Sequence, residues 1–357
     1  MKRILVTWAG WSAAYDFIES LRNNPEGEQF YIVWTDTKKF HIELSNIDAA
    51  YQVPLTSDPK YLEIINEIIH REQIEFVHSQ PEQEVLFFSE NKDKLNAKIF
   101  FPDIETIKIC QDKMRFNTIL RDLNMPVPES YMVTDEESLR ISLDKILQNN
   151  EKAWVRAIRW AGSKWALPVI EFEQAKSWIE YWAKMKWLGY GDFMVSEFLP
   201  GAEYAFQSIW KDGELIMSQA RERVEYLYGF LSPSGQSSTP SVAVTVHNEE
   251  VNQAVERVVK AIDPRATWVF CADLKTDKNG KIMLMEINVG RFFTTSYFFS
   301  AAWCNMPYYY TKMAYGESLN YTGPKFNCIP AGWCWVRMVD MGYKLIKNNE
   351  WKIQKIY

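Results

Sequence analysis

Three oxygen-bearing side chains in the C-terminal half of the sequence could bind a divalent metal ion. Asp273 lies in one apolar segment, Glu286 and Asn288 lie in the next, and residues 277–280 between them have the composition of a tight turn. A hairpin would place Asp273 opposite Glu286, and alternate residues share one face of a strand. Mg²⁺ takes a few protein oxygens and completes its shell with phosphate oxygens. The pattern predicts a Mg²⁺ site, also suited to Mn²⁺; a solvated hairpin with incidental acids is the alternative.

Segments with helical and extended patterns alternate along the first hundred residues. Apolar runs at 3–7, 31–33, 74–78 and 98–101 read as strands, and 13–21, 61–69 and the region of 85–88 read as helices. This alternation predicts a mostly parallel sheet flanked by helices. Beyond it, a helix is expected from residue 113 to residue 123. Longer strands joined by turns at 211–213 and 277–280 then predict an antiparallel α+β region.

These features resemble the ATP-grasp superfamily, particularly its carbamoyl-phosphate-synthase-like branch, over roughly residues 1–320. Asp273, Glu286 and Asn288 look like the metal-binding positions of that family. The resemblance implies a mixed α/β and α+β fold. A Rossmann-like pre-grasp domain would span 1–106, a two-lobed ATP-grasp domain would span 107–323, and a C-terminal extension, 324–357, would pack on the body.

The segment 195–203 resembles the part of the family that lies between the two lobes and reads the nucleotide. The resemblance implies that Glu197, Phe198 and Leu199 contact adenine and that Glu203 binds the ribose hydroxyls. A strand followed by a Pro-Gly turn is common in proteins, and it is the alternative interpretation.

Basic and loop residues match the positions that hold the ATP phosphates in this family. Arg156 lies within an apolar strand, where a cation is costly unless it is paired. By resemblance, Lys113 and Arg156 bind the phosphates, and Arg291 contacts the transferred phosphoryl group. An exposed structural arginine is the alternative for Arg291. The loop 159–166 would cover the phosphates, and its backbone N–H groups, with those of Gly162, Ser163 and Lys164, would bind anionic oxygens.

Two further segments are candidates for substrate binding. The serine-rich stretch 232–238 follows Arg221 and Arg223. A surface loop is the preferred interpretation, and a substrate-binding loop is the alternative. The N-terminal domain is expected to contribute residues near Ser12 and residues 80–84, because ligands favour the carboxyl ends of strands in parallel sheets.

The resemblance implies an ATP-dependent ligase that activates a carboxylate as an acyl phosphate for attack by an amine. The alternatives are phosphorylation of bicarbonate or carbamate, as in carbamoyl-phosphate synthases, and a degenerate protein that binds without catalysis. A dinucleotide-binding oxidoreductase does not fit, because the first loop lacks the glycine pattern and acidic residue of that fingerprint. The expected partners are small-molecule carboxylates and amines, with a homodimer possible.

Composition and charge exclude several other classes. A net charge of −6 without a long basic run gives no reason to expect nucleic acid or an acidic membrane. No run approaches the length of a membrane span, and the first apolar run is too short for a signal peptide, so a cytoplasmic protein is expected. The five cysteines are widely spread without a CxxC pair, and there are four histidines. Disulfides and a zinc site are therefore not expected.

Seven tryptophans stand where the ATP-grasp resemblance leads us to expect glycine. They are Trp8, Trp11, Trp34, Trp160, Trp165, Trp268 and Trp303. The chain has 15 Trp and 15 Gly, whereas average usage predicts about 25 Gly. Returning the seven to glycine would raise the glycine count to 22. We hypothesise that the source reads UGA as glycine; the degenerate site filled by indoles is the competing explanation.

Overall fold

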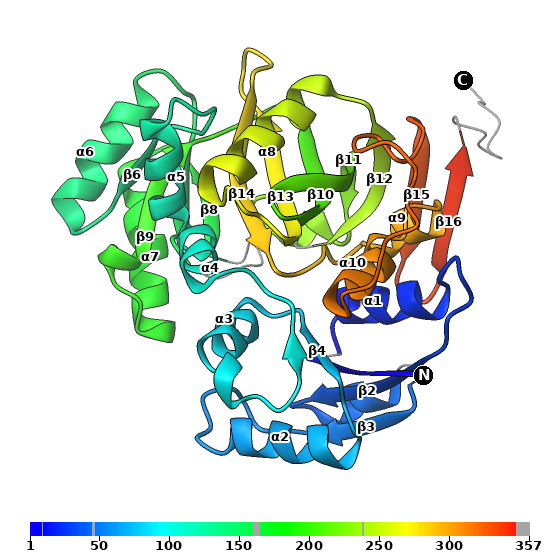
Figure 1. Ribbon diagram of the computed structural model, residues 1–357. Coiled ribbons are helices and arrows are strands. Elements are labelled where there is room, and N and C mark those ends of the chain that lie inside the picture. The colour runs from blue at the N-terminus through cyan, green and yellow to red at the C-terminus, as the bar shows by residue number, and fades with distance from the viewer. Residues whose placement is uncertain (9, 45–46, 160–164, 238, 348–357) are drawn as a thin grey trace.

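The computed structural model describes residues 1–8, 10–44, 47–159, 165–237 and 239–347. Near the N-terminus, five parallel strands form a sheet in the order β3-β2-β1-β4-β5 (Figure 1). They are β1 (Lys2–Thr7), β2 (Phe30–Asp36), β3 (Ala49–Gln52), β4 (Phe76–Ser79) and β5 (Lys98–Ile99). The accompanying helices are α1 (Ser12–Arg22), α2 (Tyr61–Arg71) and α3 (Glu82–Glu90). The predicted parallel sheet is confirmed, although β3 was not foreseen.

Strand β1 is apolar without alternation because it is the middle strand of a sheet covered on both faces. Ile4, Leu5 and Val6 are completely buried, as expected for a central parallel strand. The chain continues from β1 to β2 on one side, and β4 pairs on the other. The carboxyl ends of β1 and β4 therefore meet at the point where the strand order reverses, which is where ligands bind in such sheets.

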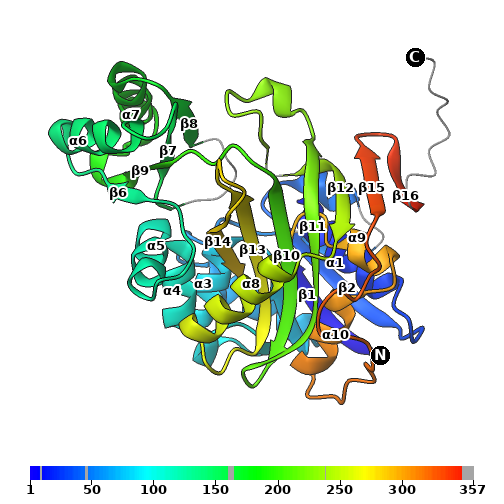
Figure 2. The same ribbon diagram turned by 90° about the horizontal axis from the view of Figure 1, so that it is seen from above.

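Two antiparallel sheets follow (Figures 1 and 2). The smaller has the order β6-β9-β7-β8 and consists of β6 (Ser130–Met132), β7 (Ala153–Ala157), β8 (Ala166–Val169) and β9 (Phe193–Glu197). The larger has the order β14-β13-β10-β11-β12-β15-β16. Its strands are β10 (Glu203–Lys211), β11 (Glu214–Tyr226), β12 (Pro240–Val246), β13 (Trp268–Thr276), β14 (Ile282–Val289), β15 (Trp333–Met338) and β16 (Gly342–Lys347). The expected α+β region with antiparallel sheet is confirmed.

The remaining helices connect and cover these sheets. They are α4 (Ile104–Gln111), α5 (Lys113–Asp122), α6 (Glu136–Leu147), α7 (Phe172–Lys186), α8 (Glu249–Ile262), α9 (Tyr297–Ala301) and α10 (Met306–Ala314). Short 3₁₀ helices span Lys39–Leu44, Lys92–Lys94, Tyr190–Asp192 and Gly229–Leu231. Helix α5 begins where the sequence predicts it, because the Asp112 side chain accepts a hydrogen bond from the Arg115 N–H.

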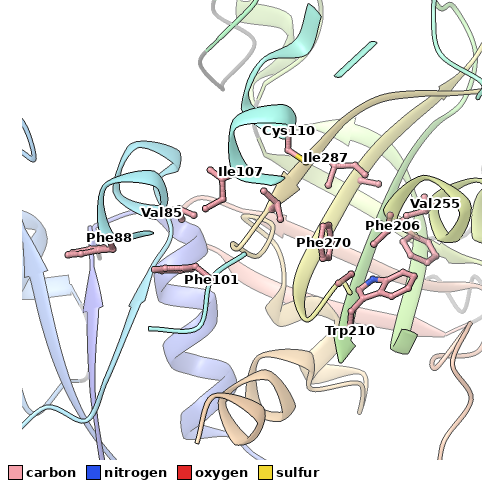
Figure 3. Packing of buried hydrophobic residues seen from close by; sticks show 14 of the residues in the cluster. Val85, Phe88, Phe101, Ile107, Cys110, Phe206, Trp210, Val255, Phe270 and Ile287 are labelled. Carbon is pink, nitrogen blue, oxygen red and sulfur yellow. The ribbon is translucent and has the colours of Figure 1, made fainter. Parts of the chain in front are cut away.

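One hydrophobic core joins the N-terminal unit to the large sheet. In Figure 3, Ile107 of α4 lies between Phe88 of α3 and Ile287 of β14. Phe270 of β13 and Val255 of α8 belong to the same core. The small sheet instead packs with α6 and α7 around a separate core. The N-terminal unit and the large sheet thus share buried side chains, whereas the small lobe has a core of its own.

Residues 333–347 form a strand pair that extends the large sheet. Strands β15 and β16 pair antiparallel, and β15 also pairs with β12. The domain limits at residues 106 and 323 stay predictions. No helix in the described ranges is long and apolar enough to cross a membrane.

The expectation that the chain has no disulfide is wrong. Cys304 and Cys328 form one, with their Cα atoms 6.1 Å apart. They are 24 residues apart in the sequence, but the chain folds back after α10 and brings Cys328 beside the end of α9. Sequence spacing alone does not reveal this approach.

Thiol counting tests this bond directly. The unfolded, unreduced protein is expected to titrate three thiols, those of Cys110, Cys271 and Cys334. After reduction it should titrate five. Five thiols before reduction, from protein purified without reductant, would contradict the disulfide.

Within the part of the chain that the structure describes, four tryptophans have a left-handed backbone, in which a side chain is strained. Their φ angles are 51° at Trp8, 59° at Trp187, 140° at Trp268 and 68° at Trp303. Three of them belong to the set identified from the sequence, and Trp187 is new. The N–H of Trp187 closes α7 by bonding to the Ala183 carbonyl, at the position where helices commonly end in a left-handed glycine.

Three other members of the set do not share this backbone strain. Trp11, Trp34 and Trp165 are not among the residues with positive φ, and Trp160 lies outside the described residues. The backbone therefore gives independent support to the glycine hypothesis at three of the seven positions and extends it to Trp187.

Candidate active site

The three candidate metal ligands lie together on the β13–β14 hairpin. Asp273 and Glu286 are direct partners in the strand register, and Asn288 is opposite Cys271. The Asn288 side-chain amide donates to Asp273 Oδ2 at 3.2 Å. The described residues contain no cluster of three or more His, Cys, Asp or Glu side chains suited to a metal. A metal bound here would therefore depend on two carboxylates and an amide oxygen, a set of hard donors that fits Mg²⁺.

Two of the expected cations approach Glu286 from different elements. Lys113 begins α5, and its Nζ lies 3.6 Å from Glu286 Oε2. Arg156 comes from β7 in the small lobe; its Nη1 lies 3.9 Å from the same oxygen, and its Nη2 donates to the Met285 carbonyl at 3.4 Å. Arg156 is only 6% exposed. The carboxylate of Glu286 compensates the charge that the sequence places in an apolar strand.

Two more arginines complete the group. Arg223 of β11 forms ion pairs with Asp273 Oδ1 at 2.5 Å and with Glu203 Oε1 at 3.2 Å. Arg291, which follows β14, donates to Asn288 Oδ1 and to Glu82 Oε1, the latter at 2.7 Å. Glu82 belongs to the N-terminal unit, so Arg291 links that unit to the candidate metal strand.

The electrostatics of the two acids differ. Burial raises the pKa of Asp273 to about 6, although Arg223 opposes this. Burial acts in the same direction on Glu286, but Lys113 and Arg156 outweigh it and hold the pKa of Glu286 below its usual value. Above pH 7 both groups are mainly carboxylates, as metal ligands must be.

These side chains line one cavity of about 160 Å³. Lys113, Arg156, Arg223 and Arg291 all reach it, together with Asp273, Glu286 and Asn288. Each of these four cations already forms an ion pair, with Glu286, Asp273, Glu203 or Glu82, and together they offer charged donors to an anion bound in the cavity.

The segment expected to read adenine borders this cavity. A smaller cavity of about 20 Å³ is lined by Glu197, Phe198 and Leu199 at the end of β9, and it shares Trp154 and Arg156 with the larger one. The Trp154 and Phe198 rings lie 6.0 Å apart. The segment 197–199 and the cationic cavity are therefore neighbours.

Glu203, the expected ribose ligand, lies at the start of β10 and lines the central cavity. Its carboxylate accepts hydrogen bonds from the Tyr226 hydroxyl and from Gln236 Nε2, the latter at 2.9 Å. Lys275 Nζ lies 3.7 Å away. Gly162, Ser163 and Lys164 lie outside the described residues; Trp165 and Ala166, which follow them, line the cavity.

Sequence reasoning missed several residues of the site. Arg223 was noted beside Arg221 without a role, although it contacts both Asp273 and Glu203. Gln236 and Ser237 of the serine-rich stretch line the central cavity, which favours the substrate-loop interpretation over a surface loop. Residues 80–84, in contrast, were expected to contribute: Gln80 Oε1 accepts from the Phe292 N–H at 3.2 Å, and Glu82 pairs with Arg291. The spacing of Arg221 and Arg223 on one strand face was the available signal.

Neither a protein-family model nor a curated protein matches the sequence. Solved structures do match. The biotin carboxylase domain of Hydrogenobacter thermophilus 2-oxoglutarate carboxylase aligns over 94% of this chain and 73% of its own, with 15% identity and a TM-score of 0.70. An N5-carboxyaminoimidazole synthetase from Staphylococcus aureus covers 94% and 82% at 13% identity, TM-score 0.67. L-Amino acid ligase from Bacillus licheniformis covers 94% and 79% at 13% identity, TM-score 0.65.

All three are ATP-grasp enzymes. They align with this chain through the N-terminal unit and both antiparallel sheets, because the alignments cover 94% of it. The chain therefore has the fold of the ATP-grasp enzymes.

Proposed function

We propose that this protein is an ATP-dependent ligase that phosphorylates a carboxylate and transfers the resulting acyl group to an amine. The observation that carries the proposal is the pairing of Asp273 with Glu286 on adjacent strands, inside a cavity lined by four cations and bordered by the Glu197–Leu199 segment. Similar structures support the nucleotide: one carries MgADP and bicarbonate, and another carries ADP.

The residues present fit Mg²⁺ and ATP. Asp273, Glu286 and the Asn288 amide oxygen would hold Mg²⁺, and Glu197, Phe198, Leu199 and Glu203 would hold the nucleoside. Bound Mg²⁺ neutralises phosphate charge and orients the γ-phosphoryl group for in-line attack. Lys113 and Arg156 bind phosphate oxygens, and Arg291 orients the acceptor oxyanion. With four fixed cations in place, little reorganisation is needed as negative charge moves from one oxygen to another.

The proposed reaction has two steps. A carboxylate oxygen attacks the γ-phosphorus and ADP leaves, which gives an acyl phosphate. An amine nitrogen then attacks the acyl carbon, phosphate leaves and the amine loses a proton, so that a carbon–nitrogen bond forms. The second candidate is phosphorylation of bicarbonate or carbamate, which the bicarbonate in a similar structure favours.

Hydroxylamine tests this proposal without knowledge of the natural amine. The protein is incubated with Mg-ATP, hydroxylamine and a panel of carboxylic acids, and hydroxamate and ADP are both measured. We expect equal amounts of hydroxamate and ADP for one acid. Formation of both products should be abolished in Glu286→Gln and unchanged in the surface variant Lys260→Gln. If bicarbonate supports ADP formation and no acid gives hydroxamate, the second candidate is the correct one. The absence of ADP throughout would overturn both.

The tryptophan positions bear on which form of the chain is active. We infer that Trp8, Trp187, Trp268 and Trp303 are glycine in the protein as its source makes it, because their backbone is the one that glycine adopts. The hydroxylamine assay is therefore run on the protein with tryptophan at these four positions and on its four-glycine variant. A protein that binds ATP but forms no ADP in either version would be the degenerate alternative. A homodimer, as in the biotin carboxylase neighbour, and a cytoplasmic location remain proposals.

A further inference from the structure

A second cavity lies outside the candidate nucleotide site, next to α1, α9 and the β15–β16 pair. Its volume is about 430 Å³, and its walls include Asp16 and Arg337. Thr239, in its wall, donates a hydrogen bond to Thr294, in the wall of the central cavity, with 3.1 Å between their hydroxyl oxygens. The walls of the two cavities thus meet at this pair of threonines.

Asp16 presents a buried carboxyl group to this second cavity. The residue is 4% exposed, and its Oδ2 accepts a hydrogen bond from the Tyr297 N–H at 3.2 Å. Burial raises the pKa of Asp16 to about 7, although Arg337 and Arg221 act to lower it. Both arginines are close enough to influence Asp16, yet neither forms an ion pair with it within 4.0 Å. A buried acid of this kind gains from a cation that completes its interactions.

The two arginines have buried donors that nothing among the described residues accepts. Nε of Arg337 is buried without a hydrogen-bond partner. Arg221 is fully buried, and its Nη1 donates to the Thr295 carbonyl at 3.0 Å, whereas its Nε and Nη2 have no acceptor. Arg221 lies outside the wall of the cavity, with its guanidinium over phenylalanine rings. Arg337 lines the cavity, and because a buried donor without a partner costs free energy, its Nε points to a ligand that supplies an acceptor.

Aromatic side chains form part of the remaining wall, which also includes the acids Glu19 and Asp340. Tyr15, Tyr297, Trp335 and Tyr343 line the cavity, and the Trp335 and Tyr343 rings stack with 4.4 Å between centroids. The wall of the cavity thus combines acids, the guanidinium of Arg337 and apolar ring surface. A small molecule with a positive and a negative group and an apolar portion would match all three features.

We propose that this cavity binds an amino-acid-like zwitterion, with its ammonium group on Asp16 and its carboxylate on Arg337. The inference rests on the proposed function, for which it supplies the amine substrate: the Thr239–Thr294 pair is the passage between the bound amine and the acyl phosphate. Arg221 stabilises the carboxylate side of the site from behind the wall.

Binding without ATP tests the site separately from the reaction. The melting temperature is measured with each proteinogenic L-amino acid in turn, and the amino acids that raise it are compared with their N-acetyl derivatives and their decarboxylated amines. At least tenfold weaker binding is expected for both derivatives, because each lacks one charge. The same measurement with Mg-ATP alone reports on the proposed function independently.

Two variants and a control locate the binding. Arg337→Gln is expected to weaken binding of the parent amino acid at least tenfold but to leave binding of the decarboxylated amine unchanged. Asp16→Asn is expected to weaken binding of the parent amino acid and to leave binding of its N-acetyl derivative unchanged. Arg71→Gln, on the exposed face of α2, should change nothing. If Asp16→Asn does not fold, Arg337→Gln alone decides.

Each remaining outcome contradicts one claim. If no amino acid raises the melting temperature, or if the derivatives bind as tightly as the parent, the zwitterion site is wrong, and a response to Mg-ATP would leave the proposed function standing. If an amino acid binds as expected but Mg-ATP has no effect, the site is right and the ligase function is wrong.

Discussion

Replacing Trp8, Trp187, Trp268 and Trp303 together with glycine is expected to raise the free energy of unfolding by about 3–6 kcal/mol. A left-handed backbone costs a residue with a side chain about 1–2 kcal/mol, and glycine avoids this cost. Trp187 and Trp303 are 93% and 74% exposed, so they lose little packing when they are replaced. Chemical denaturation of both forms measures the difference.

A neighbouring tryptophan provides a matched control. Trp210 of β10 is the register partner of Trp268 of β13, but Trp210 is fully buried and donates its indole N–H to the Ser208 hydroxyl at 2.9 Å. Trp210→Gly is expected to cost about 3–5 kcal/mol or more, whereas Trp268→Gly stabilises. Equal destabilisation by the two changes would contradict the glycine hypothesis.

The gene adds a separate test of the codon explanation. UGA at positions 8, 187, 268 and 303, with UGG at position 210, is expected. UGG at all five would exclude codon reassignment even if glycine proved stabilising. Trp187 is the informative position, because it was found from the backbone of α7 and not from the family resemblance.

Glu286→Gln is expected to reduce ADP formation by about 100-fold or more. The change removes one of two carboxylates from the candidate Mg²⁺ site, and the loss of a single electrostatic contact at a reaction centre commonly costs about 100- to 1,000-fold. It also leaves Lys113 and Arg156 without their shared carboxylate. The variant's own denaturation curve must therefore accompany the assay.

Glu203→Gln is the contrasting variant. Glu203 lies at the candidate ribose position and pairs with Arg223 and Lys275, so its loss should weaken ATP binding about tenfold and leave turnover at saturating ATP within a few-fold. If Glu286→Gln and Glu203→Gln had the same effect on turnover, the division into metal and ribose ligands would be wrong.

Much of the fold could be predicted because its signals are local. The apolar run of β1, the Asp112 cap of α5 and the turn before β14 each depend on neighbouring residues. The Asp273–Glu286 pairing followed for the same reason: a short turn fixes the register of the strands that it joins.

The unforeseen features all depend on distant parts of the chain. The Cys304–Cys328 bond, the Glu82–Arg291 contact and the place of Arg223 between Asp273 and Glu203 each join segments that no local pattern relates. Composition and the family resemblance pointed to the tryptophan anomaly and included Trp268, but only the backbone angles added Trp187. Short strands with ordinary composition, such as β3, give too little periodic signal to be recognised.

The most direct test of the central claim is the effect of Mg-ATP on the melting temperature of the four-glycine protein and of its Glu286→Gln variant. A ligand at about 100 times its dissociation constant stabilises the native state by about 2.7 kcal/mol, which for a chain of this size is a rise of about 3–4 °C. The expected result is that rise in the parent protein, lost when Mg²⁺ is chelated and lost in Glu286→Gln. No rise in the parent, or the same rise in the variant, would contradict an ATP site built on Asp273 and Glu286.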